Sequence, residues 1–182
     1  AQRGAATYGA DFAIPFSSFH RFQRSDSAWA NALTPALADY QSHALPSGPR
    51  MLPAFVHVDC ETDEVTGLDP EEVPIVVRRP EEFGDSWSDP LTAGDKAGID
   101  AYFRRCEGLH DHFRFIEVRC GGASTSVRLN RDKPGVGITF EAPRASFMRC
   151  VTDEFFDDLL SGNFMRTTLH GVRSLYPDFS PI

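Results

Sequence analysis

The residues of this chain that could do chemistry gather close to its first positions. An apolar run at residues 12–16 leads directly into the sequence SSFHR at positions 17–21. Binding and catalytic side chains often lie in loops that follow strand ends. The hydroxyl and guanidinium groups here could bind a substrate. The candidate substrate-binding residues of this segment are Ser17, Ser18, Arg21 and Arg24, and His20 lies among them.

The same side chains also have a purely structural interpretation. His20 could simply be hydrogen-bonded at the end of a strand. Arg21 and Arg24 lie close to Asp26 in the sequence, so they could bind an anionic substrate or form a surface ion pair. Both alternatives stay open at the level of the sequence.

No other pattern in the chain predicts a complete catalytic site. His110 and His112 have the spacing of a ligand pair, but they follow a predicted helix and are interpreted as surface or hinge histidines. The six histidines fall on at least four predicted elements, so they are not expected to form one dinuclear site. The chain also lacks the Gly-x-Ser-x-Gly elbow and the glycine-rich phosphate loops. We therefore assign no catalytic residue within this chain.

Charge and composition exclude several classes of protein. A net charge of -8 and a pI near 5.2 leave no basic footprint for nucleic acid. No apolar run approaches the ~20 residues that span a membrane. The four cysteines form no Cys-x-x-Cys pair and no secretion signal is recognised, which favours a cytoplasmic protein. Acidic residues crowd positions 59–85 without calcium-loop spacing, so they predict a solvated surface.

The first part of the chain has the alternating helices and strands of a layered α/β protein. Strands are expected at 11–16 and 51–58, side by side in one sheet. Helices are expected to end at Gly9, to span 27–33, and to span 34–44 across the two strands. Two strands alone do not make a stable sheet. Their neighbours must come from the second part, from a partner or from residues outside this chain.

The second part, beyond Asp89, predicts a self-contained α+β domain. Strands at 113–120 and 124–129 flank Gly121-Gly122, which is a hairpin signal, and a third strand is expected at 136–141. The three strands are expected to form an antiparallel sheet.

Helices are expected to cover this sheet. One helix, at 95–109, has an apolar face that comprises Ile99, Tyr102, Phe103 and Cys106. An apolar stripe then recurs every fourth residue at Phe147, Val151, Phe155 and Leu159. A second helix could begin within that run, Gly162 ends it, and a last short helix is expected at 163–170.

Two family resemblances follow from these segments. The order of a helix, a Gly-Gly hairpin, the strand GVGITFEAP and the segment FFDDLLSGNFMRTTLHG resembles a sterol-carrier-protein-like domain over residues 94–172. That family follows its third strand with a helix, a Leu-Leu-x-Gly turn and a further helix, and it encloses an apolar tunnel. The segments GADFAIPFSSFHRFQRSDSAWAN, MLPAFVHVD, EEFGDSWSDPL and LYPDFSP together resemble the C-terminal portion of a metallo-β-lactamase-fold family.

The metallo-β-lactamase resemblance implies a metal-dependent enzyme. In that superfamily a late strand of the αββα sandwich runs into a loop that faces a dinuclear metal site. Some of its hydrolases, alkylsulfatases among them, carry a C-terminal sterol-carrier-like domain, so the two resemblances support each other. The signature His-x-His-x-Asp-His is not in this chain. The late-strand metal ligand would fall close to Ser17 and Ser18, and the resemblance therefore makes His20, the nearest histidine, the candidate metal ligand.

The sequence therefore predicts an α/β remainder of a metallo-β-lactamase-like sandwich at 1–93 and an α+β sterol-carrier-like domain at 94–182. The expected function is that of the C-terminal part of a metal-dependent hydrolase or oxidoreductase, which supplies one wall of the site and an apolar domain over the substrate. The complete protein is expected to contain an upstream metallo-β-lactamase portion and to bind zinc or iron. This chain alone is expected to bind no metal. The candidate apolar substrate-binding residues are Phe147, Val151 and Phe155.

Two alternatives belong to other classes of protein. The chain could be a non-catalytic carrier that holds an apolar, lipid-like ligand under the stripe from Phe147 to Leu159. It could also serve mainly to form a homo-oligomer. In each catalytic or carrier reading the partner is a small molecule, apolar or anionic, and not a nucleic acid or a membrane.

Overall fold

The computed structural model describes residues 2–14, 20–35, 39, 46–68, 74–175 and 179. The chain is a mixed α/β protein with several small sheets. It divides into two compact units: unit 1 comprises Ala1–Gln23 and Ala28–Val77, and unit 2 comprises Arg24–Ser27 and Arg78–Ile182. The expected boundary near Asp89 lies inside unit 2, where Asp85 is hydrogen-bonded to Ser146 and Trp87 to Asp26.

Unit 1 contains short elements. Its helices are α1 (Gln2–Thr7) and the 3₁₀ helix η1 (Ala28–Leu33), and its strands are β1 (Phe12–Ala13), β2 (Arg50–Met51), β3 (Val56–Val58) and β4 (Val65–Gly67). β1 and β2 pair in parallel, with Ala13 opposite Met51, whereas β3 and β4 form an antiparallel hairpin.

The sequence predicted part of unit 1. The pairing of the 11–16 segment with the start of the 51–58 segment is confirmed, because Ala13 lies opposite Met51. The expected strand at 51–58 is not continuous, since residues 56–58 form β3 in a separate sheet with β4. α1 is followed by Gly9 in the left-handed conformation at φ 67°. The short helix at 27–33 is also confirmed, as η1. The β3–β4 hairpin was not predicted. Most of the helix expected at 34–44 lies outside the described residues.

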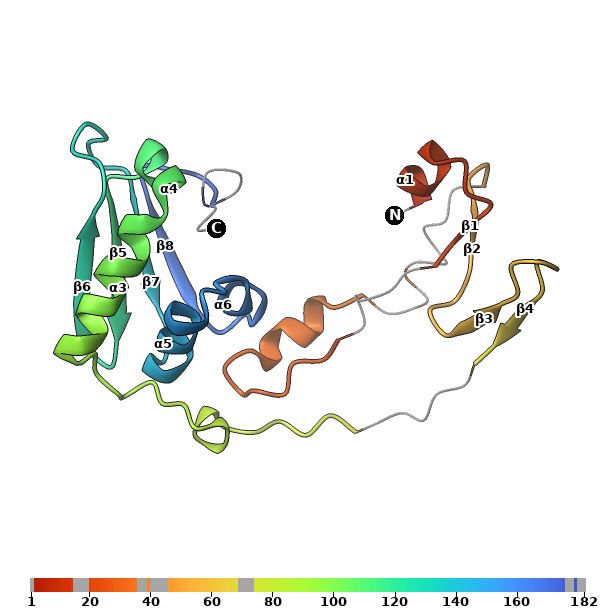
Figure 1. The fold of residues 1–182 in the computed structure, drawn as a ribbon. Helices are drawn as coiled ribbons and strands as arrows, with labels where there is room; N and C mark the ends of the chain where they lie inside the picture. Colours follow the sequence, from red (N-terminus) through yellow and green to blue (C-terminus); the bar gives the residue numbers. More distant parts are fainter. Residues whose placement is uncertain are drawn as a thin grey trace. The chain divides into compact units, whose positions relative to one another are not determined.

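Unit 2 is built on one four-stranded sheet. The 3₁₀ helix η2 (Pro80–Phe83) precedes the helices α3 (Ala93–Arg105) and α4 (Glu107–His112). The sheet has the order β6-β5-β7-β8, formed by β5 (Phe115–Cys120), β6 (Ala123–Arg128), β7 (Gly137–Glu141) and β8 (Arg166–His170). α5 (Arg144–Asp153) and α6 (Asp157–Ser161) lie between β7 and β8 in the chain. Figure 1 shows α3 and α5 on the same face of the sheet.

Two predictions about this sheet are wrong. The three strands were expected to be antiparallel, but β7 pairs with β5 in parallel. The end of β6 lies next to the start of β5. A strand that starts at this same end, on the other side of β5, must run parallel to β5, and β7 does so. At this end the backbone of Arg114 is hydrogen-bonded to both Leu129 and Val136. The segment 163–170, expected to be a helix, contains β8, which pairs antiparallel with β7. Its central Thr167 and Thr168 are β-branched, which favours a strand.

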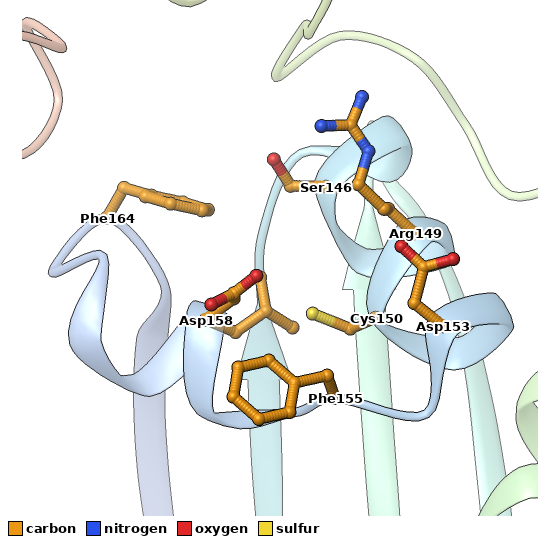
Figure 2. A pocket seen from close by; sticks show the side chains of 8 residues that line it. Ser146, Arg149, Cys150, Asp153, Phe155, Asp158 and Phe164 are labelled. Carbon is orange, nitrogen blue, oxygen red and sulfur yellow. The ribbon is translucent and has the colours of Figure 1, made fainter.

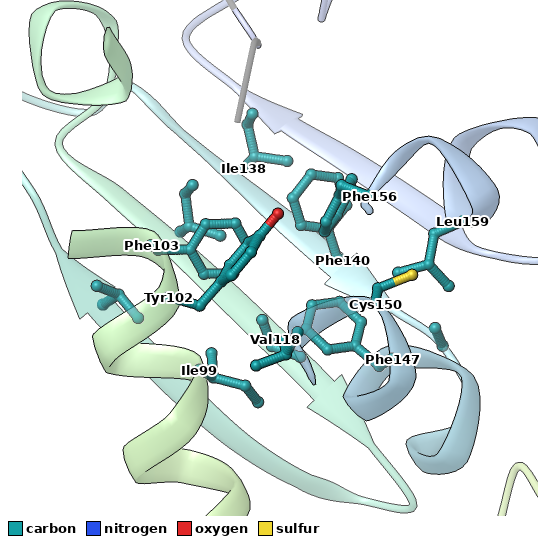
Figure 3. Packing of buried hydrophobic residues seen from close by; sticks show 14 of the residues in the cluster. Ile99, Tyr102, Phe103, Val118, Ile138, Phe140, Phe147, Cys150, Phe156 and Leu159 are labelled. Carbon is teal, nitrogen blue, oxygen red and sulfur yellow. The ribbon is translucent and has the colours of Figure 1, made fainter. Parts of the chain in front are cut away.

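Aromatic side chains fill the space between the sheet and the helices (Figure 3). The rings of Phe103, Phe140, Phe147 and Phe156 lie 5.1 to 6.5 Å apart between centroids and are fully buried. The predicted face of the 95–109 helix is confirmed, because Ile99, Tyr102, Phe103 and Cys106 are all buried. Each fully buried large side chain contributes about 1.5–3 kcal/mol by leaving water, so this core dominates the stability of unit 2.

The first helix of this core is fixed by a carboxylate. Thr92 and Asp95 form a capping box at the start of α3, in which the Thr92 amide donates to Asp95 over 2.7 Å. Arg144, the first residue of α5, donates two hydrogen bonds to the same carboxylate, at 2.6 and 3.0 Å. These bonds from Arg144 and Thr92 outweigh burial and lower the pKa of Asp95 to about 2.

Replacing Asp95 by Asn is expected to remove a pH-dependent part of the stability. The pKa of Asp95 is below the ~3.9 of an unfolded Asp, so its contribution is present above about pH 4 and is lost as the pH falls towards 2. Urea unfolding at several pH values should show wild type and Asp95→Asn converging over that range. Asp100→Asn is the control, because it removes only an exposed ion pair on the same helix. A constant difference between wild type and Asp95→Asn would contradict this role.

The Gly121–Gly122 turn of the hairpin gives a matched pair of substitutions. Both glycines have positive φ, 53° and 77°, so any side chain there is strained. A Cβ atom on Gly121 would also overlap the backbone of Asp89 and Pro90, whereas one on Gly122 would meet open space. We expect Gly122→Ala to cost about 1 kcal/mol of unfolding free energy and Gly121→Ala about 2–4 kcal/mol. Equal costs for the two variants in urea titrations would contradict the close approach of the 89–90 backbone.

Candidate functional site

The described residues of the predicted polar cluster belong to two different units. Ser17 and Ser18 lie outside the described residues. His20 and Arg21 are exposed in unit 1, where the His20 ring packs edge-on against Phe22 at 4.9 Å. The Arg21 guanidinium donates to the carbonyl of His20 over 3.2 Å. Arg24 belongs to unit 2, so the predicted wall is divided between two units.

Arg24 is held by two carboxylates in unit 2. It donates to both oxygens of Asp26, with Nε to Oδ1 at 3.1 Å and Nη2 to Oδ2 at 2.9 Å. Its Nη1 donates to Asp85 at 2.9 Å and to the hydroxyl of Ser146 at 3.3 Å. Burial disfavours the guanidinium cation, but the hydrogen bonds to the two carboxylates outweigh it and raise the pKa of Arg24. These four residues, Arg24, Asp26, Asp85 and Ser146, are called the Arg24 clasp below.

Asp85 connects the clasp to a helix end. Only 4% of this residue is exposed. Its carboxylate accepts the Ser146 hydroxyl at 2.6 Å and the Ser146 amide at 3.3 Å. Ser146 lies in the first turn of α5, whose N-cap Pro143 offers no side-chain acceptor. Asp85 therefore takes the part of a capping residue from a distant segment. The prediction of a solvated acidic surface at 59–85 is wrong at this residue.

Aromatic rings enclose the clasp. The indole Nε1 of Trp87 donates to Asp26 over 2.8 Å, and the Arg24 guanidinium lies 4.1 Å from the centre of the Phe164 ring. Burial disfavours the Asp26 carboxylate, but the hydrogen bonds from Arg24 and Trp87 outweigh it and lower its pKa. Of the two alternatives for Arg24, the ion pair with Asp26 is the one that this structure forms.

The predicted apolar substrate-binding residues divide between the core and the surface. Phe147 and Val151 are buried on α5, whereas Phe155 is 48% exposed. The helical stripe is interrupted because Glu154 ends α5 in the left-handed conformation at φ 59°. The turn shifts the register, so Phe156 occupies the core and Phe155 lies outside it.

A pocket of about 150 Å³ lies beside Phe155, between α5, α6 and Phe164 (Figure 2). It is called the α5–α6 pocket below. Its apolar lining is Cys150, Phe155, Leu159 and Phe164, and its polar lining is Ser146, Arg149, Asp153 and Asp158. Ser146 also belongs to the clasp, so the two features are adjacent. Of these lining residues the sequence predicted Phe155, and noted Leu159 as part of the stripe. The others come from two helices and a loop, which no local pattern joins.

The chemistry of the pocket is that of binding. Burial raises the pKa of the Cys150 thiol to about 11, despite a hydrogen bond from the Leu159 backbone, so this thiol is not a nucleophile near neutral pH. No histidine is among the lining residues, and the hydroxyl of Ser146 donates to a carboxylate. The lining has an apolar floor and a charged rim, which suits a small amphiphilic molecule.

The described part of the chain holds no cluster of three or more His, Cys, Asp and Glu residues that could bind a metal ion. His57 is exposed on β3, and His43 lies outside the described residues. His110 contacts the carbonyl of Arg104 at 3.0 Å, and His170 contacts the hydroxyl of Thr139 at 2.9 Å. Zinc or iron therefore finds no ligand set among these residues.

Comparisons of the chain with protein-family models, with curated proteins and with solved structures found no match. Among the helices that the structure describes, none is both long and apolar enough to cross a membrane.

Removing either half of the clasp is expected to destabilise unit 2. Asp85→Ala leaves the Arg24 cation partly buried and α5 without its acceptor, and we expect a loss of about 3 kcal/mol in unfolding free energy. Arg24→Ala should cost a similar amount, and the double variant clearly less than the sum, because the two residues share one interaction. Arg21→Ala is the control, with an expected change within about 0.5 kcal/mol. Additive effects in urea titrations would show that the clasp contributes no coupling.

Proposed function

We propose that this chain acts as the C-terminal part of a metal-dependent hydrolase of the metallo-β-lactamase superfamily. In this proposal unit 1 completes the sheet of the catalytic domain, and unit 2 is a non-catalytic, sterol-carrier-like domain beside the substrate. The observation that carries the proposal is the apolar surface of unit 1, together with the sequence segments that resemble this superfamily.

The described part of unit 1 buries few apolar side chains and exposes many. The buried hydrophobic side chains in its described part are Ala30 and Leu52. Its exposed large apolar side chains are Tyr8, Ile14, Trp29, Leu33, Phe55, Leu68, Ile75, Val76 and Val77. This number of exposed large apolar side chains is expected where a unit contacts another protein surface.

The strands of unit 1 support the same conclusion. β1 and β2 pair in parallel over two residues each. Parallel strands occur almost only in sheets that are covered on both faces, and two short strands are not stable alone. A larger sheet from the catalytic domain would provide both the neighbouring strands and the cover for the apolar side chains.

The metal would be bound elsewhere in the complete protein. Because the described residues include no ligand set, we derive no step through a metal from them. In the complete enzyme zinc or iron would activate water. This chain would contribute His20 at most, and unit 2 would limit the access of water and substrate to the site.

A carrier of a small apolar molecule is the second candidate, and the α5–α6 pocket favours it. The Phe147 ring packs against the rings of Phe103 and Phe156, so the space beside it is filled by these rings. A cavity near 150 Å³ holds about one aromatic ring, whereas sites for larger ligands measure about 300–1,000 Å³. The pocket therefore fits a small ligand better than a long acyl chain.

Metal analysis separates these candidates. The purified 182-residue chain is expected to retain less than one equivalent of zinc or iron after mild chelation and to have no hydrolase activity. Protein expressed from the complete natural reading frame should retain metal through a His-x-His-x-Asp-His motif. A full equivalent in this chain, lost in His20→Ala or His110→Ala, would contradict the proposal, and so would a complete frame without that motif. A mass that doubles in light scattering would favour contact between copies through unit 1.

A further inference from the structure

The α5–α6 pocket combines an apolar floor with a negatively charged rim. We propose that it binds a small organic cation with an aromatic or short alkyl body, such as an arylalkyl ammonium. This inference concerns unit 2 alone and does not rest on the proposed hydrolase function.

The apolar part of the pocket is built by the break between the two helices. Cys150 and Leu159 are buried and line the pocket together with Phe155 and Phe164. Figure 2 shows the Phe155 ring near Cys150 and the Phe164 ring on the other side of Asp158. Phe155 remains 48% exposed although it is a large aromatic residue of a well-packed unit. An exposed ring at the rim of a cavity provides contact area for a ligand, and the volume of about 150 Å³ suits one ring or a short alkyl group.

The charge of the pocket favours a cation. Asp153 and Asp158 line it together with one arginine, Arg149. The adjacent clasp adds the carboxylates of Asp26 and Asp85 and the guanidinium of Arg24. The pocket lining and the adjacent clasp together contain four carboxylates and two guanidinium groups, and this excess of negative charge stabilises a positively charged ligand and repels an anion.

The rings add a second attraction for a cation. Phe164 already accepts the Arg24 guanidinium at 4.1 Å from its ring centre, which shows that a cation packs well on this ring. Phe155 offers a further ring face at the pocket. An ammonium group between the carboxylates of Asp153 and Asp158 would leave its apolar body against Phe155 and Leu159.

Three probes of similar size test this proposal on the full chain: 2-phenylethylammonium, 3-phenylpropanoate and 2-phenylethanol. Titration followed by protein NMR should give a dissociation constant on the order of 1 mM for the cation, as is usual for a fragment of this size. The alcohol should bind several-fold more weakly, and the anion at least tenfold more weakly. Raising the salt concentration from 0.05 to 0.5 M should weaken the binding of the cation alone.

Substitutions test whether the cation binds in the α5–α6 pocket. Asp158→Asn should weaken the binding of the cation about fivefold or more and leave the binding of the alcohol unchanged, whereas Arg149→Gln should strengthen the binding of the cation. Phe155→Ala should weaken both ligands. The matched controls are Asp157→Asn, an exposed acid on the same helix that does not line the pocket, and Leu160→Ala. Circular dichroism would be used to check that each variant is folded.

Three outcomes would overturn the proposal. One is the absence of cation binding up to about 10 mM by folded wild type. Another is anion binding as tight as cation binding. The third is equal weakening by Asp157→Asn and Asp158→Asn, which would indicate attraction to the net charge of the chain instead of a built site.

Discussion

The organisation of unit 2 depends on one buried carboxylate. Asp85 is shielded from water and accepts hydrogen bonds from Arg24 and from both donors of Ser146. A carboxylate in such a place is stable only if its charge is compensated. The compensation joins three segments that are far apart in the chain: residues 24–27, residues 78–88 and the start of α5. The position of α5 then determines the packing of the aromatic core and the shape of the α5–α6 pocket.

The clasp also explains why the units divide where they do. Residues 24–27 lie between two stretches of unit 1, yet they belong to unit 2 because Arg24 and Asp26 have their partners there. Ser25 adds a backbone hydrogen bond to Arg78 at 2.8 Å. The chain therefore enters unit 2 at residues 24–27, returns to unit 1 for residues 28–77, and enters unit 2 again at Arg78.

The sequence predicted the local features of the fold and missed the long-range ones. The buried face of α3 and the Gly121–Gly122 hairpin follow from periodicity and turn chemistry, which act within a few residues. The parallel pairing of β7 and the strand β8 depend on which strands lie next to each other, which periodicity does not encode. For the site, Arg24 and Phe155 were singled out, but their surroundings were not. Asp85 looked solvated because its partners are more than fifty residues away in either direction.

The left-handed residue Glu154 connects the core to the surface chemistry of unit 2. A continuous helix from Phe147 to Leu159 would place every fourth side chain against the sheet, including Phe155. The turn at Glu154 ends α5, and the core then receives Phe156, whose ring packs on Phe103, Phe140 and Phe147. A non-glycine residue in this conformation is costly by about 1 kcal/mol, and the buried Phe156 ring offsets that cost. The same turn leaves Phe155 outside, next to the carboxylates of Asp153 and Asp158. The apolar stripe read from the sequence thus serves two purposes, a filled core on one side and a small, negatively charged pocket on the other.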